Sequence, residues 1–191
     1  MITFFERSIY SSRLVFAENG FESGYVDTTE WALYCDWSSY LLKTVKQLKL
    51  DAIIYLKCQP EVCGERMKIR SRNEESSVPQ EYLDQLHEKY ESWLGEKGWM
   101  TEKPITIDKS EIHASVKRAL ADVPVLVLDC TQEFEHDPER RDKLVGDVKD
   151  FLFKITSKDQ SDFEEELVLL NLSKNVDFFY KNDSFFDCCY A

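Results

Sequence analysis

Residues 51–75 read DAIIYLKCQPEVCGERMKIRSRNEE. The run 51–57 is short, apolar and rich in isoleucine, which is typical of a strand buried on both faces of a parallel sheet. Pro60 follows closely and suits the first turn of a helix, because that turn leaves its N–H groups without intrahelical partners. We therefore predict a strand over 51–57 and then a helix from Pro60 toward Arg70.

Similar patterns lie on both sides of this stretch. Two further runs, ITFFE at 2–6 and VPVLVLDC at 123–130, are too short for buried helices and are predicted as parallel strands. Helical patterns separate and follow the strands: 28–48 (with a cap at Thr28 or Thr29), 79–94 and 138–155. This alternation predicts an α/β domain over 1–155, a parallel sheet flanked by helices, and a separate acidic and aromatic tail over 156–191.

The composition excludes several classes of protein. The chain has 191 residues, a formal net charge of −12 and a pI near 4.8, so it is not expected to bind nucleic acid or anionic membranes. No apolar run approaches the roughly 20 residues that a membrane helix needs. The start, MITFFERS, lacks the basic region of a signal peptide. The six cysteines form no CxxC pair or zinc-finger spacing, so we expect thiols in a reducing compartment.

Positive charge gathers between residues 66 and 72 in this acidic chain. Arg66, Lys68, Arg70 and Arg72 repel one another, so an anion is expected beside them. Arg66 and Arg70 lie four residues apart and share one helix face. Guanidinium groups at several points suit a polyphosphate, whose charge is spread over many oxygens. The alternative is a solvated helix with ion pairs to nearby glutamates, namely Glu61, Glu65, Glu74 and Glu75.

Four segments together carry a family resemblance. They are FFERSIYSSRLVFAENGFESG (4–24), EWALYCDW (30–37), the long run 50–94 that contains ERMKIRSRNEE, and VPVLVLDC (123–130). In their order, their spacing and the residues that they contain, these segments resemble the deoxyribonucleoside kinases, above all the deoxycytidine and deoxyguanosine kinases. The resemblance spans about residues 2–155. It implies a P-loop-kinase-like fold and the transfer of phosphate from ATP or another nucleoside triphosphate, with Mg²⁺, to the 5′-hydroxyl of deoxynucleosides in nucleotide salvage.

The resemblance assigns a donor side. ERMKIRSR resembles the family's mobile lid, which implies that Arg66 lies beside the adenine and that Arg70 and Arg72 bind the phosphates. Phe134 matches the loop aromatic that stacks on the donor base. Phe134 could equally serve only to pack under its loop, as aromatic side chains most often do.

The resemblance also assigns an acceptor side. Glu6 of the ERS motif would help to hold Mg²⁺, and Arg7 would contact the 5′-oxygen and steady the catalytic carboxylate. Glu75 matches the glutamate that accepts a hydrogen bond from the sugar 3′-hydroxyl. Ser12 stands in YSSR where deoxycytidine and deoxyguanosine kinases carry an aspartate that reads the base, which hints at a broader or more pyrimidine-directed pocket.

One part of the family pattern is missing from this sequence. The phosphate loop GxxxxGK[ST] cannot be formed by any of the six glycines, which are Gly20, Gly24, Gly64, Gly95, Gly98 and Gly146. In the family's strand order, 2-3-1-4-5, the strand that carries this loop lies between the strand predicted at 2–6 and the one at 51–57. Its absence would leave two apolar edges unpaired. We therefore expect the chain to be incomplete at its amino-terminal end and inactive by itself.

Two alternatives remain beside the kinase. The chain could be a non-catalytic, kinase-derived module that dimerises through the aromatic face of 28–48, since family members pair through helices as homodimers. It could also be a different phosphotransferase, such as a thymidylate kinase, because lids with several arginines recur among these enzymes. The compartment implied by the family is the cytoplasm, which we favour, or the mitochondrion.

Overall fold

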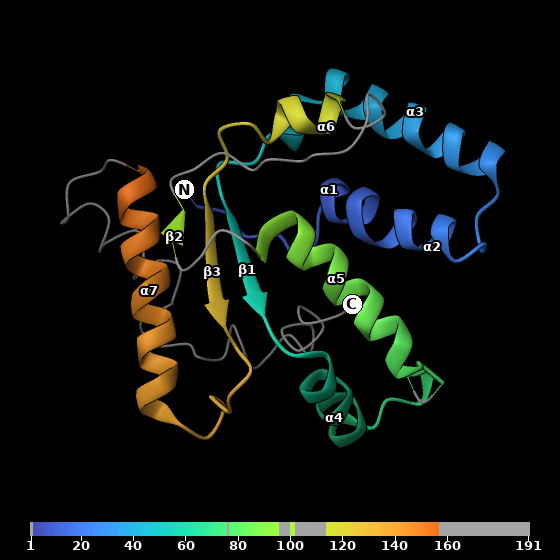
Figure 1. The fold of residues 1–191 in the computed structure, drawn as a ribbon. Helices are drawn as coiled ribbons and strands as arrows, with labels where there is room; N and C mark the ends of the chain where they lie inside the picture. Colours follow the sequence, from blue (N-terminus) through green and yellow to red (C-terminus); the bar gives the residue numbers. More distant parts are fainter. Residues whose placement is uncertain (1, 76, 96–99, 102–113, 157–191) are drawn as a thin grey trace.

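The computed structural model describes residues 2–75, 77–95, 100–101 and 114–156 of the chain (Figure 1). The helices and strands, in order, are α1 (Ile9–Ser11), the π-helix η1 (Ser12–Ala17), α2 (Glu18–Glu22), α3 (Thr28–Thr44), the 3₁₀ helix η2 (Lys46–Leu48), β1 (Ile53–Lys57), α4 (Pro60–Arg70), the 3₁₀ helix η3 (Asn73–Glu75), α5 (Gln80–Leu94), β2 (Met100–Thr101), α6 (Ala114–Ala119), β3 (Val125–Asp129) and α7 (Pro138–Thr156).

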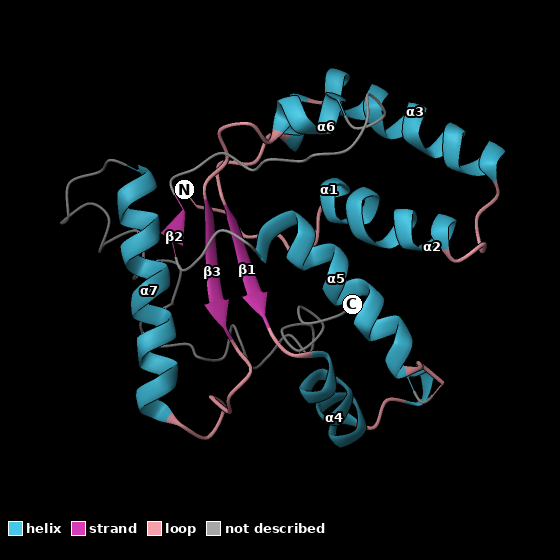
Figure 2. Ribbon diagram, viewed as in Figure 1, coloured by secondary structure: helices cyan, strands magenta, loops and turns pink. Residues whose placement is uncertain are grey.

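The sheet has three described strands in the order β1-β3-β2 (Figure 2). Strands β1 and β3 are parallel, in a register that runs from Ile53 opposite Val125 to Lys57 opposite Asp129. This confirms the strands predicted at 51–57 and 123–130. The two-residue strand β2 pairs antiparallel with β3 and was not predicted, because two residues are too few to show a periodicity.

Successive residues of the two parallel strands face opposite layers. Val125 and Val127 pack with residues of α1, η1, α5 and α6 in one core cluster. Leu126 and Leu128 pack in a second cluster with Phe151 of α7. The ribbon shows the same layering, with α7 on one side of the strands and α1 and α5 on the other (Figure 1). The helices flank the sheet as predicted, since a strand buried on both faces needs a cover on each.

The strand predicted at residues 2–6 is wrong. This segment has no regular structure, and Ile2 and Phe4 pack beside Leu152 of α7 rather than within the sheet. Phe5 is 78% exposed. A strand exists only by pairing its N–H and C=O groups with a neighbour, and among the described strands none pairs with this segment.

Helix α3 confirms the prediction at 28–48 with two differences. Its cap is Asp27, whose carboxylate accepts from the N–H groups of Thr29 and Glu30 at 2.7 and 2.9 Å, while Glu30 accepts from the Asp27 N–H. This reciprocal arrangement is a capping box and replaces the cap predicted at Thr28 or Thr29. The α-helix ends at Thr44, and only a 3₁₀ turn follows.

Helical structure at residues 9–22 was not predicted. Elements α1, η1 and α2 follow one another without a break, and η1 is a π-helix. Arg13 lies inside this segment, fully buried, and donates to the Cys35 carbonyl at 3.3 Å and to the hydroxyls of Ser38 and Ser39 at 2.7 and 2.9 Å. Arg13 therefore ties the segment that carries Ser12 to α3.

The remaining helices follow the prediction closely. Helix α4 begins at Pro60, α5 follows Pro79, and α7 extends one residue beyond the predicted 138–155. Helix α5 buries an apolar stripe that includes Leu83, Leu86 and Trp93. In the part of the chain that the structure describes, none of the helices combines the length and the apolar character needed to cross a bilayer. The predicted tail, 156–191, lies outside the described residues apart from Thr156, which ends α7.

Candidate nucleotide site at the carboxyl ends of β1 and β3

Helix α4 places Arg66 across the carboxyl ends of the two parallel strands. One guanidinium nitrogen of Arg66 donates to the Cys58 sulfur at 3.3 Å, just beyond β1. Another donates to the carbonyls of Thr131 and Gln132 at 3.4 and 3.2 Å, just beyond β3. In open parallel sheets the space outside these strand ends is the usual ligand site, and α4 lies there (Figure 1).

Phe134 lies against the same guanidinium. The Arg66 guanidinium carbon is 5.5 Å from the centre of the Phe134 ring, within the range of a cation–π contact. The ring is half-buried and also packs beside the second core cluster. The structure thus brings together Arg66 and Phe134, the two residues to which the sequence assigned the donor base, although they are far apart in the chain.

The loop after β3 is held by local hydrogen bonds. Asp129 accepts from the backbone N–H of Thr131 at 2.9 Å, and this bond holds the pKa of the Asp129 carboxyl below its usual value. Arg140 of α7 donates to the Asp129 carbonyl at 3.0 Å and to the Gln132 side chain at 2.7 Å. These contacts fix the backbone on which Arg66 and Phe134 meet.

Arg70 and Arg72 meet on one carboxylate. Arg70 binds Glu75 in a two-pronged contact, with its Nε 3.2 Å from Oε2 and a terminal nitrogen 2.5 Å from Oε1. Arg72 lies 3.8 Å from the same Oε1. The backbone turns back after α4 because Ser71 adopts a left-handed conformation, φ 54° and ψ 40°, which ends the helix and redirects Arg72 toward Glu75.

The acceptor-side residues lie at the start of the helical segment 9–22. Glu6 and Arg7 are exposed, and Arg7 has a positive φ of 56°. The Arg7 guanidinium lies 4.9 Å from the centre of the Phe16 ring. Arg7 also acts on Tyr82 of α5, since its charge lowers the pKa of the Tyr82 hydroxyl, although burial raises that pKa more. Ser12 is half-buried at the first position of η1.

The predicted residues therefore form three separate groups. Arg66 lies with Phe134, Arg70 and Arg72 lie with Glu75, and Arg7 lies with Phe16. Among the described residues, no hydrogen bond or ion pair joins Glu6 or Arg7 to the arginines of α4. Convergence of all these groups on one ligand stays a prediction. The sequence analysis gave no site role to Phe16 or Tyr82, and it placed Tyr82 only within the helix predicted at 79–94.

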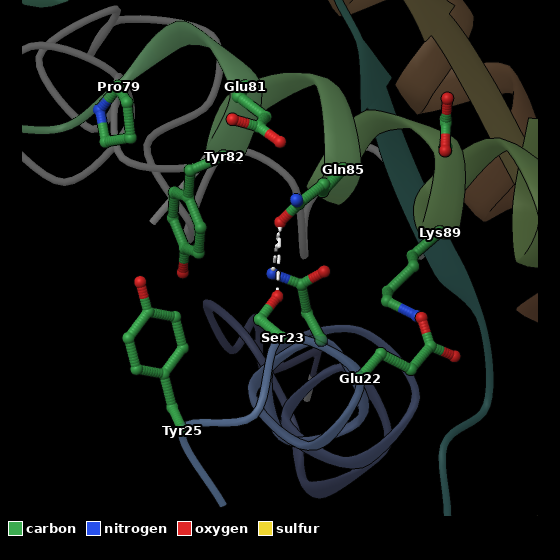
Figure 3. Close-up of a pocket in the computed structure, with 10 residues that line it drawn as sticks. Glu22, Ser23, Tyr25, Pro79, Glu81, Tyr82, Gln85 and Lys89 are labelled. Atoms are coloured by element: carbon green, nitrogen blue, oxygen red, sulfur yellow. Dashed lines mark hydrogen bonds and ion pairs between the residues drawn. The ribbon is translucent and has the colours of Figure 1, made fainter.

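A cavity of about 650 Å³ lies between α2 and α5 (Figure 3). Tyr25 and Tyr82 point their hydroxyls toward each other across it, and Asn19 donates to Gln85 at 3.1 Å. Lys89, nearly buried, pairs at its edge with Glu22 at 2.7 Å. None of the lining residues is a predicted site residue, and Asn19 with Gln85 and Lys89 with Glu22 already bind each other.

The possible metal ligands among the described residues can be compared with the ligands that Mg²⁺ usually has in proteins. Glu133, Glu135 and His136 form a three-residue cluster of possible ligands in the described part of the chain, and Glu6 is not in it. Mg²⁺ is commonly held by one or two carboxylates together with substrate phosphates and water. The exposed Glu6 carboxylate fits that role only as a single protein ligand.

Comparison with known proteins shows the family of this chain. The deoxynucleoside kinase family model matches residues 1–153. The chain is 42% identical over 152 residues to deoxycytidine kinase 2 of Gallus gallus and 40% identical over 155 residues to deoxycytidine kinase of Homo sapiens; each match covers 79% of this chain and 52% of the relative.

A mitochondrial deoxyguanosine kinase of Xenopus laevis is 34% identical over 152 residues, covering 79% of this chain and 52% of that protein. The chain thus spans about half the length of the curated relatives it matches. Because the family model covers most of the sequence, and because the strand ends carry the arginine and aromatic groups described above, this chain belongs to the deoxynucleoside kinase family.

Proposed function

We propose that this chain carries the donor lid and part of the acceptor site of a kinase that transfers phosphate from ATP, or another nucleoside triphosphate, to the 5′-hydroxyl of a deoxynucleoside. The observation that carries the proposal is the contact between Arg66 and Phe134 at the carboxyl ends of β1 and β3. This is the place where an open parallel sheet binds its ligand, and an aromatic ring beside a guanidinium suits a flat base.

The phosphates would bind at Arg70 and Arg72. In the structure these guanidinium groups contact the carboxylate of Glu75, which is itself an anion. A triphosphate offers more oxygens and more charge than one carboxylate, so it would displace Glu75 from the two arginines. The released Glu75 carboxylate could then accept the hydrogen bond of the sugar 3′-hydroxyl. Donor and acceptor binding would be coupled through this one residue.

The acceptor would bind beside Arg7 and Ser12. Arg7 is exposed next to Phe16, whose ring offers a flat surface near the half-buried Ser12. Ser12 has a small side chain, which favours a broad or pyrimidine-directed choice of base. Glu6 would be the protein ligand of Mg²⁺, which neutralises phosphate charge during phosphoryl transfer. The location that we propose, cytoplasmic or mitochondrial, follows the family; one relative is named as mitochondrial.

We further propose that these 191 residues alone do not complete the reaction. Phosphoryl transfer depends on positioning and charge neutralisation around the moving group. The sequence contains no GxxxxGK[ST] loop, whose backbone N–H groups, lysine and hydroxyl normally hold the phosphates and the metal. The lid arginines can bind phosphates without that loop, but they do not supply the general base.

Replacing Phe134 by alanine tests the base contact. We expect ATP to bind about 5- to 100-fold more weakly, because stacking of a base on an aromatic ring contributes about 1–3 kcal/mol. Inorganic tripolyphosphate, which has no base, should bind the variant as it binds the original chain. Isothermal titration calorimetry of both ligands measures the difference.

The matched control for this test is Phe153→Ala. Phe153 is an aromatic residue on α7 that is 38% exposed, and its loss should leave both affinities unchanged. Equal weakening of ATP and tripolyphosphate by Phe134→Ala would show that the ring only packs the loop, and the proposed base site would be wrong.

A second candidate function is a kinase-derived module that self-associates. One face of α3 exposes Leu33 by 70%, Trp37 by 60% and Tyr40 by 56%, and the rings of Trp37 and Tyr40 stack at 5.6 Å. Large apolar side chains clustered on an exposed helix face favour a protein partner. We propose a second copy of this chain as that partner, which also agrees with the homodimer expected from the family resemblance.

The double substitution Leu33→Ser with Trp37→Ser should convert a dimer to a monomer in sedimentation velocity, with a dissociation constant raised at least about 100-fold, because each buried apolar side chain contributes about 1.5–3 kcal/mol. Ile69→Ser removes an apolar side chain of similar exposure, 82%, from α4 and should leave the dimer intact. A chain that sediments as a monomer before any substitution, and binds no nucleotide, would refute this second function.

A further inference from the structure

Two cysteines lie directly opposite each other where the parallel ladder ends. The register of β1 and β3 places Lys57 opposite Asp129, and the next residues are Cys58 and Cys130. The Cys130 N–H donates to the Lys57 carbonyl at 2.7 Å and closes this last pair, so the same register, carried one residue further, sets Cys58 beside Cys130. Neighbouring strands lie about 4.8 Å apart, which falls within the Cα separation of disulfide-bonded cysteines, about 4.4–6.8 Å.

The alternation of side chains along the strands is expected to put both thiols on the same face of the sheet. Side chains alternate along a strand, and Leu56 and Leu128 face the cluster that includes Phe151 of α7. Cys58 and Cys130 each lie two residues further along, so the alternation puts them on this face, where Cys130 packs. Each is only 2% exposed.

Arg66 adds a positive charge to the pair. Its guanidinium lies 3.3 Å from the Cys58 sulfur and bonds the carbonyls of Thr131 and Gln132, which follow Cys130. A positive neighbour stabilises the thiolate, which is the form of cysteine that attacks an oxidant. The sulfur of Cys58 is therefore the better nucleophile of the two, and Cys130 is placed to resolve its oxidised form.

We propose that Cys58 and Cys130 form a reversible redox pair that responds to a hydroperoxide. The Cys58 thiol loses its proton, the thiolate attacks a peroxide oxygen and the O–O bond breaks; the leaving hydroxide takes up that proton, so the products are a sulfenic acid on Cys58 and water. The Cys130 thiol then attacks the Cys58 sulfur, the S–O bond breaks, and a second water leaves with the thiol proton. Two thiols and one hydrogen peroxide thus give one disulfide and two waters.

The disulfide would change the donor site. Once Cys58 is bonded to Cys130, its sulfur carries no negative charge and Arg66 loses that partner. Arg66 also contacts Phe134, and a guanidinium released from the oxidised sulfur would move away from that ring. The oxidised chain should therefore bind ATP about fivefold more weakly, as expected for the loss of one cation–π contact. This consequence for ATP rests on the proposed function, whereas formation of the disulfide does not.

The test uses the full chain with Cys188→Ser and Cys189→Ser, which removes the adjacent cysteines near the carboxyl end. After treatment with hydrogen peroxide, trypsin is expected to release residues 58–66 joined to residues 119–140, because cleavage sites flank both segments. Mass spectrometry should find this linked pair two hydrogen atoms lighter than the sum of its parts. Dithiothreitol should separate it.

Peptide 58–66 also contains Cys63, so two single variants decide which cysteine is linked. The linked pair should persist in Cys63→Ser and disappear in Cys58→Ser, with circular dichroism showing that both variants are folded. A link that survives Cys58→Ser, or oxidation to sulfinic acid with no link, would overturn the proposal. If the link forms but neither the reduced nor the oxidised chain binds ATP, the proposed function fails and the redox pair stands.

Discussion

Replacing Arg70 by alanine should weaken the binding of inorganic tripolyphosphate about 10- to 100-fold, because a hydrogen bond to a charged group contributes about 1.5–3 kcal/mol. Arg70 presents two nitrogens to Glu75 in a fork that matches two phosphate oxygens equally well. Calorimetry at one fixed ionic strength measures the effect, since screening by salt changes every charge interaction at the surface.

Two further variants distinguish the effect of the two-pronged Arg70 contact from the effect of losing one positive charge. Lys68→Ala removes the same charge from the same helix at an exposed position and should lower the affinity less than about threefold. Glu75→Gln should act in the opposite direction and raise the affinity for tripolyphosphate, because it removes the carboxylate that competes for Arg70 and Arg72. Equal losses for Arg70→Ala and Lys68→Ala would contradict a specific phosphate site.

Replacing Arg13 by alanine should lower the free energy of unfolding by about 3–5 kcal/mol, because it leaves a cavity and buried hydrogen-bond partners that each cost about 1–3 kcal/mol when unpaired. Arg13 is fully buried and bonds Cys35, Ser38 and Ser39 of α3. The network extends to α6, because the Ser39 and Ser115 hydroxyls lie 3.1 Å apart. A loss of this size is a large part of a typical stability of about 5–15 kcal/mol.

Urea denaturation followed by circular dichroism measures this effect. The control is Arg118→Ala, an exposed arginine on α6, which should change the free energy of unfolding by less than about 0.5 kcal/mol. An Arg13→Ala chain as stable as the Arg118→Ala chain would show that the hydrogen bonds of Arg13 do not hold the helical segment 9–22 to α3.

The fold could be predicted where the pattern was local. β1 and β3 lie within the apolar runs, α4 begins at Pro60, and α5 begins just after Pro79. Residues 2–6 have the same apolar composition as a strand, but a strand requires a partner, and composition does not reveal whether one is present. The segment 9–22 was missed because Arg13 interrupts its apolar pattern, and only α3 supplies the hydrogen bonds that allow an arginine to be buried there.

The sequence supplied the residues that we propose for the site, but it did not predict the contacts that they make in the structure. The spacing of Arg66 and Arg70 predicted that both lie on one face of a helix. The family resemblance assigned Arg66 to the adenine and Arg70 to the phosphates of the same nucleotide. In the structure Arg66 reaches the loop after β3, while Arg70 reaches Glu75. This divergence depends on the left-handed Ser71 and on a strand far along the chain, neither of which leaves a mark on the local spacing.

The central claim is that the groups described here serve phosphoryl transfer to a deoxynucleoside. The most direct measurement is turnover of a panel of deoxynucleosides with Mg-ATP, by this chain and by a version extended upstream of residue 1 with a strand, GxxxxGK[ST] loop and helix. The account predicts deoxynucleoside monophosphate from the extended version only, and loss of that product when Arg70→Ala is introduced into it. A folded extended version that binds ATP but forms no product, or turnover by the 191-residue chain alone, would contradict it.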